Sequence, residues 1–137
     1  MIFQSIGRLR YSEPTLGVYR LVLEIDSQIN AYYLSLVPKY FALRSQKHGS
    51  HITVCRPFRE EPTDLGAWRK HEGVEIVWCY SSTIRFNDSY AWLDVWSLDL
   101  ERVRRELGLS LVNSVEGPWL FGYIYRFHTT LGNFKEL

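Results

Sequence analysis

Residues 50–56 read SHITVCR, and their alternation of polar and apolar side chains predicts a β-strand. Side chains two residues apart in a strand share a face and lie about 7 Å apart, so His51 and Thr53 project together. Ile52 between them then points to the opposite, packed side. Because threonine is common in strands, this segment taken alone is ordinary strand sequence with a partly exposed histidine.

A second segment near the end of the chain repeats the pattern. Residues 126–132 read RFHTTLG, and His128 stands two residues before Thr130 as His51 does before Thr53. One such segment is weak evidence for a site, whereas two segments in equivalent places are hard to assign to chance. A repeated order of elements around the two segments would point to an internal repeat.

The first half of the chain predicts a strand, a helix and the strand that carries His51. Residues 18–25 form a β-branched and aliphatic run typical of a strand, after which Asp26 or Ser27 caps a helix. Apolar and aromatic residues follow at helical spacing: Ile29, Tyr32, Tyr33 and Leu36. Pro38 ends this helix, and residues 41–45 form a short extended segment before the strand at 50–56.

The second half predicts the same order. Residues 89–97 read as a strand, Ser97 or Asp99 caps a helix over residues 100–107, and Gly108 ends it. A final strand over about 120–131 carries His128. Aligning Ser27 with Ser97 displaces the two halves by about seventy residues.

The segment between the halves predicts a short helix over residues 63–73 and a hairpin that turns at Asn87-Asp88. A chain of 137 residues suits one domain, which we place at 1–137. The sequence therefore predicts a single α+β domain with two similar halves.

Composition narrows the kinds of partner. The 16 basic residues nearly cancel the 15 acidic ones, which disfavours long duplex nucleic acid but still allows a small charged substrate. No apolar run approaches membrane-spanning length and residues 1–10 do not resemble a signal peptide, so we expect a cytoplasmic protein without a membrane partner. Cys55 and Cys79 form no Cys-x-x-Cys pair, and we expect both to be small buried hydrophobes.

Two histidines and two threonines suggest chemistry on a phosphate if the two motif strands lie side by side. Opposed side chains would then come within about 5 Å and form a four-cornered group. We call this group the His–Thr cluster: His51, Thr53, His128 and Thr130. Threonine hydroxyls can hold phosphate oxygens, and two imidazoles can supply a base and an acid without a metal.

Other chemistries fit the sequence less well. His48, His51 and His71 lack a carboxylate or cysteine that completes a convincing zinc set, so we expect no metal. The glycines form neither a phosphate-binding loop nor a nucleophile elbow. The main alternative of another class is a noncatalytic protein that sequesters a nucleotide in the same cluster.

The segments His51-Ile52-Thr53-Val54 and His128-Thr129-Thr130-Leu131 resemble the paired His-x-Thr/Ser-x signatures of the 2H phosphoesterase superfamily. The resemblance implies a bilobal fold, with two pseudo-two-fold related lobes of antiparallel strands, helices on the outside and a central cleft. It also implies a mechanism without a cofactor. One histidine activates water or a ribose 2'-hydroxyl, the other protonates the leaving oxygen, and Thr53 and Thr130 bind the phosphoryl oxygens.

Three further features bear on the branch of the superfamily. Arg56 resembles a basic residue often found after the first motif, whereas Ser50 and Asn133 stand where many members have proline and a basic residue. Residues 8–17, RLRYSEPTLG, and the short chain resemble phage anti-CBASS proteins, which hydrolyse cyclic oligonucleotide messengers of bacterial immunity in the host cytoplasm. The alternative within the superfamily is an RNA-processing phosphodiesterase acting on 2',3'-cyclic phosphates or 2'-5' linkages.

A nucleotide substrate also needs aromatic platforms and cations beside the reacting phosphate. The candidates are Tyr11, Arg56, Trp68, Trp119 and Tyr123, with Lys47 as an alternative cation to Arg56. Residues of these types more often fill cores or cover the surface than bind a ligand.

Overall fold

The computed structural model describes residues 1–46, 49–112, 120 and 122–134 and has an α+β fold. The strands are β1 (Ile2–Tyr11), β2 (Leu21–Glu24), β3 (Arg44–Ser45), β4 (His51–Cys55), β5 (Glu75–Ser81), β6 (Arg85–Phe86), β7 (Tyr90–Trp96) and β8 (Phe127–Asn133). The described residues also form two α-helices, α1 (Ser27–Ser35) and α2 (Leu98–Glu106), and short 3₁₀ helices at Lys39–Phe41 and Leu65–Ala67. Every strand pairing within the described residues is antiparallel.

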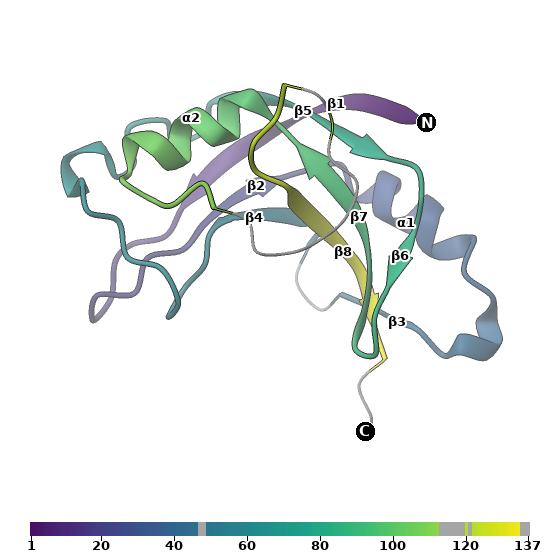
Figure 1. Ribbon diagram of the computed structural model, residues 1–137. Coiled ribbons are helices and arrows are strands. Elements are labelled where there is room, and N and C mark those ends of the chain that lie inside the picture. Colours follow the sequence, from purple (N-terminus) through teal and green to yellow (C-terminus); the bar gives the residue numbers. More distant parts are fainter. Residues whose placement is uncertain (47–48, 113–119, 121, 135–137) are drawn as a thin grey trace.

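Six of the strands close into a barrel. Their order around it is β1, β2, β4, β8, β7 and β5, and the pairing of β5 with β1 completes the ring. The two-residue strands β3 and β6 extend β8 and β7 at the edges. In the view of Figure 1, β8 runs through the centre, with α1 on one side of it and α2 on the other. The last strand of the chain therefore joins the two halves by pairing with both β4 and β7.

Local capping signals fix where both helices begin. The Asp26 side chain accepts a hydrogen bond from the N–H of Gln28 at the start of α1, and the Ser97 hydroxyl accepts one from Leu100 at the start of α2. Gly108, at φ +75°, follows the end of α2 in the left-handed conformation that glycine adopts without strain. For each helix the cap is one of the two residues that the sequence offered, and the predicted stop at Gly108 is confirmed.

The core lies on one side of the strands. Ile52 of β4, Leu93 of β7 and Leu23 of β2 are fully buried and belong to one hydrophobic cluster, which the apolar face of α2 covers through Leu100 and Val103. Cys55 and Cys79 are also buried and free, as expected. Burial raises the pKa of the Cys55 thiol to about 11, so it stays protonated at neutral pH.

The sequence-based expectations need four corrections. The ten-residue strand β1 was not predicted, and β2 is shorter than residues 18–25. Strand β8 starts at Phe127 rather than near 120. The segment expected to form a short helix over 63–73 contains only a single 3₁₀ turn.

The buried face of α1 also differs from the predicted one. Tyr32 and Leu36 are exposed, whereas Asn30 and Tyr33 are buried against the sheet. The reason is a polar contact. The Asn30 side chain donates to the hydroxyl of Thr129 and to the carbonyl of Thr130, which rotates the helix toward β8. No helix among the described residues is long and apolar enough to span a membrane.

Candidate active site

Strands β4 and β8 lie side by side and bring the two histidine segments together. Ile52 pairs with Thr129 in antiparallel register. Extending this register by one residue in each direction sets Thr53 opposite His128 and His51 opposite Thr130. Ile52 and Thr129 are both buried, so the four residues of the His–Thr cluster share the other face. The two imidazoles occupy diagonal corners, for which the typical separation is about 7–8 Å between Cα atoms.

A backbone contact orients His51. Its Nδ1 lies 2.8 Å from the carbonyl oxygen of Gly49. Because a carbonyl can only accept, Nδ1 carries the proton and donates it. This leaves Nε2 as the ring nitrogen available to a ligand in the cluster.

His128 lies among charged groups. Desolvation is the largest of the influences that lower the pKa of His128 below its ordinary value, even though solvent reaches the side chain. The carboxylate of Asp94 acts in the opposite direction, while the positive charges of His51, Arg126 and Arg56 lower the pKa further. The net result favours a neutral imidazole at neutral pH.

Helix α1 supports the cluster from the core side. Asn30 Nδ2 donates to Thr129 Oγ1 at 2.9 Å and to the Thr130 carbonyl at 3.2 Å. These bonds lie directly beneath the His128-Thr129-Thr130 segment and fix the backbone from which His128 and Thr130 project. Sequence reasoning missed Asn30 because its bonding partners lie about 100 residues away.

A polar group missed by the sequence analysis continues the face of the cluster onto β7 and β6. Asp94, which is 1% exposed, lies opposite His128 in the β7–β8 pairing. Its carboxylate accepts from Arg85 Nη1 at 3.0 Å and from Trp92 Nε1 at 3.1 Å. Arg126 Nε lies 3.5 Å from the same carboxylate.

One feature of the sequence could have indicated this polar group. Asp94 is a lone carboxylate in the otherwise apolar and aromatic strand YAWLDVW, residues 90–96. Buried carboxylates are rare unless they are paired. The arginines that pair with it lie in other strands or next to them, so they could not be assigned from local sequence.

Among the residues expected to bind substrate, Tyr11 and Trp68 lie in core contacts. Tyr11 is 7% exposed, and its ring meets that of Trp68 edge to face at 5.0 Å. Trp68 also packs on Tyr19 and donates its indole N–H to the carbonyl of Ser12. Both aromatic rings therefore serve packing in this structure.

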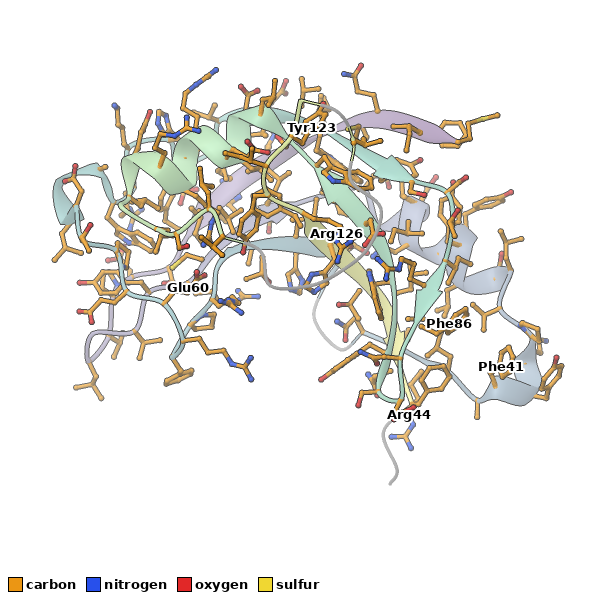
Figure 2. All side chains as sticks on the ribbon, viewed as in Figure 1. Phe41, Arg44, Glu60, Phe86, Tyr123 and Arg126 are labelled. Atoms are coloured by element: carbon orange, nitrogen blue, oxygen red, sulfur yellow. The ribbon has the colours of Figure 1, made fainter. Side chains whose placement is uncertain are left out.

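The other expected substrate residues are distributed differently. Arg56 directly follows β4, is exposed, and lies close enough to His128 to influence its pKa. The Tyr123 hydroxyl lies 3.6 Å from the sulfur of Cys79. Figure 2 shows Tyr123 beside α2, away from Arg126, the neighbour of Asp94, which lies near the middle of the view. Trp119 and Lys47 lie outside the described residues.

Within the described part of the chain, no three His, Cys, Asp or Glu side chains are grouped to hold a metal ion. In comparisons with known proteins, no family model, no curated protein and no solved structure matches this chain.

Proposed function

We propose that this protein is a metal-independent phosphodiesterase of the 2H type that hydrolyses cyclic oligonucleotides. The observation that carries the proposal is the antiparallel pairing of Ile52 with Thr129. This single register places two histidines and two threonines on one face, with each histidine opposite a threonine of the other strand. Two distant segments of the chain thereby form one site with the groups that phosphodiester hydrolysis needs.

The strand order supports a two-lobed arrangement of the 2H kind. One half of the ring contains β1, β2 and β4, and the other contains β5, β7 and β8. The halves meet at β1–β5 and at β4–β8. Exchanging β1 with β5, β2 with β7 and β4 with β8 therefore leaves the order of the ring unchanged. Each helix joins corresponding strands, α1 between β2 and β4 and α2 between β7 and β8.

The proposed reaction divides proton transfer between the histidines. The neutral imidazole of one takes a proton from water as the water oxygen bonds to phosphorus. The other donates its proton to the sugar oxygen as the phosphorus–oxygen bond breaks. Thr53 and Thr130 donate hydrogen bonds to the nonbridging oxygens, where negative charge develops in the transition state.

The lowered pKa of His128 favours this residue as the base, since a neutral imidazole can accept a proton. His51 then serves as the acid. Its Nδ1–H bond to Gly49 leaves Nε2 to carry the transferred proton toward the leaving oxygen. Diagonal placement puts the two rings on different sides of a phosphate held between the threonines.

Two alternatives use the same cluster. An RNA-processing enzyme would act on 2',3'-cyclic phosphates or 2'-5' linkages, and a sequestering protein would bind nucleotides without turnover. The test is a panel of cyclic di- and trinucleotides, linear 2'-5' oligomers and 2',3'-cyclic mononucleotides, assayed with and without EDTA. We expect turnover of cyclic oligonucleotides that survives the chelator.

Variants test the roles of the histidines. Replacing His51 or His128 by alanine should lower turnover by about 10² to 10⁴, and the double variant should lose less than the product of these factors. His71 is the matched control, because it pairs with Glu106 through a 2.8 Å contact in another part of the molecule. Full activity in His51→Ala, or loss of activity in EDTA that zinc restores, would contradict the mechanism.

A further inference from the structure

The face that carries the His–Thr cluster continues without a break to a guanidinium group on β6. In the register set by Ile52 and Thr129, His51 lies opposite Thr130. Thr130 pairs with Trp92, and Trp92 pairs with Arg85. Directly paired residues in antiparallel strands share a face, so this row runs across β4, β8, β7 and β6 on one side of the sheet.

Contacts within the described residues fix Arg85 in this row. Its Nη1 donates to Asp94 at 3.0 Å, and its guanidinium carbon lies 5.4 Å from the centroid of the Trp92 ring. Trp92 in turn donates its indole N–H to the same carboxylate at 3.1 Å. Asp94, at 1% exposure, thus holds both the cation and its aromatic support.

Arg85 nevertheless keeps free donors. Its side chain is 27% exposed, and within the described residues only Nη1 makes a hydrogen bond. A guanidinium has five N–H donors in a planar fork that suits phosphate oxygens. A buried carboxylate that orients an arginine while leaving part of the fork open to solvent is an arrangement suited to binding an anion.

The position of this group relative to the cluster defines the ligand. Neighbouring strands lie about 4.8 Å apart, so the backbone of Arg85 is about 10 Å from that of Thr130, and its guanidinium lies over Trp92 between them. A second phosphate joined to the first through one sugar can therefore lie between the Thr130 hydroxyl and this guanidinium.

We propose that Arg85, supported by Trp92 and Asp94, forms a second phosphate-binding subsite beside the His–Thr cluster. The protein then selects substrates with at least two phosphodiester groups over those with one. This inference rests on the proposed function and narrows its substrate class, because a cyclic oligonucleotide satisfies the second subsite and a 2',3'-cyclic mononucleotide does not. Trp92 also offers an aromatic surface next to Thr130 for a base attached to the bound phosphates.

The experiment compares two probes, cyclic di-AMP and adenosine 2',3'-cyclic monophosphate, in the wild type and in Arg85→Gln. We expect the Kd and KM for cyclic di-AMP to rise about tenfold or more in the variant, while those for the mononucleotide change less than twofold. Arg102→Gln is the matched control, since Arg102 is an exposed arginine paired with Asp99 on α2. If Arg85→Gln weakens the binding of both probes equally, or weakens the binding of neither, the second subsite is overturned.

A second measurement needs no variant. If two phosphates contact the wild-type protein, the logarithm of Kd for cyclic di-AMP should depend on the logarithm of salt concentration with a slope larger by about one than for the mononucleotide. Equal slopes would overturn the proposal even if Arg85→Gln fails to fold. Selective binding of cyclic di-AMP without turnover would contradict the phosphodiesterase activity and support the second subsite. Turnover without selectivity for cyclic di-AMP would support the activity and contradict the subsite.

Discussion

The pKa of His128, which desolvation and then nearby positive charges lower, predicts how activity depends on pH. A base must be neutral, and the lowered pKa of His128 keeps it neutral to more acidic pH than an ordinary histidine. The acidic limb of the kcat/KM profile, which reports the free enzyme, should therefore lie below about pH 6.5. A profile measured from pH 4 to 9 at constant ionic strength tests this, and a limb above 6.5 would assign the base role elsewhere.

Replacement of Asp94 tests the influence of its carboxylate on the pKa of His128. Its carboxylate raises the pKa of His128 against the other influences, so Asp94→Asn should shift the acidic limb to still lower pH. The apparent pKa of this limb belongs to the coupled histidine pair, so the test depends on the direction in which the limb moves. An unchanged limb would mean that Asp94 does not act on the base.

A buried ion pair away from the cluster predicts acid sensitivity of the fold. Burial alone would raise the pKa of Glu60, but hydrogen bonds from Arg104 and from the Arg56 backbone outweigh it and lower the pKa to about 2. Arg104, at 1% exposure, also donates to the carbonyls of Val54 and Ser110. The pair thus ties α2 to the end of β4, just before Arg56.

Because the folded-state pKa of Glu60 lies below its unfolded value, its contribution to stability is full above about pH 4.5 and is lost as pH falls toward 2. The loss is on the order of 3 kcal/mol and should disappear in Glu60→Gln. Arg104→Met, which leaves the carboxylate unpaired, should cost about 3–5 kcal/mol at pH 7.

Urea denaturation at several pH values measures both effects. Arg8→Gln is the control, because Arg8 and Glu75 form an exposed pair that should contribute less than about 1 kcal/mol. Equal costs for Arg8→Gln and Arg104→Met at pH 7 would contradict the assigned role of the buried pair.

Strand β8 carries His128 and Thr130, and its close approach to β3 predicts the effect of one added methyl group. A Cβ on Gly132 would collide with the carbonyl oxygen of Arg44 and lie 2.9 Å from the Leu43 side chain. Gly132→Ala should therefore separate β3 from β8 and destabilise the protein by about 1–3 kcal/mol.

Gly66→Ala is the control for this substitution, since its nearest neighbour would be the Asp64 carboxylate at 3.4 Å. Thermal unfolding followed by circular dichroism distinguishes the two variants. A Gly132→Ala protein as stable as the Gly66→Ala protein would show that β3 does not pack tightly against β8.

For the whole molecule, closure of the barrel predicts where backbone amides are best protected. Val95 pairs with Tyr80 on one side and Phe127 on the other, and Ile52 lies between Leu23 and Thr129. Amides in these parts of β7 and β4 should exchange with solvent only through global unfolding.

The two-residue strands β3 and β6 lie at sheet edges, and amides there should exchange through local opening. Hydrogen exchange followed by NMR measures the two classes directly. Equal protection in β6 and in the centre of β7 would contradict the ring as the stable unit of the fold.

Much of the local structure could be predicted because its causes are neighbours in the chain. The caps at Asp26 and Ser97, the stop at Gly108 and the alternation around Ile52 act over a few residues. The sequence failed where a distant contact outweighs local pattern. Asn30 faces the core because Thr129 and Thr130 offer it hydrogen-bond partners, so the apolar spacing of Tyr32 and Leu36 predicted the helix correctly but not its buried face.

That each histidine shares a strand face with its threonine follows from the sequence alone, because side-chain direction alternates along a strand. In contrast, the folded chain is needed to show that β4 and β8 are neighbours with Ile52 against Thr129, and that Asp94, Trp92 and Arg85 extend the same face. Register between strands depends on packing of the whole core and on closure of the ring, since a shift by one residue would bury the histidines and expose Ile52.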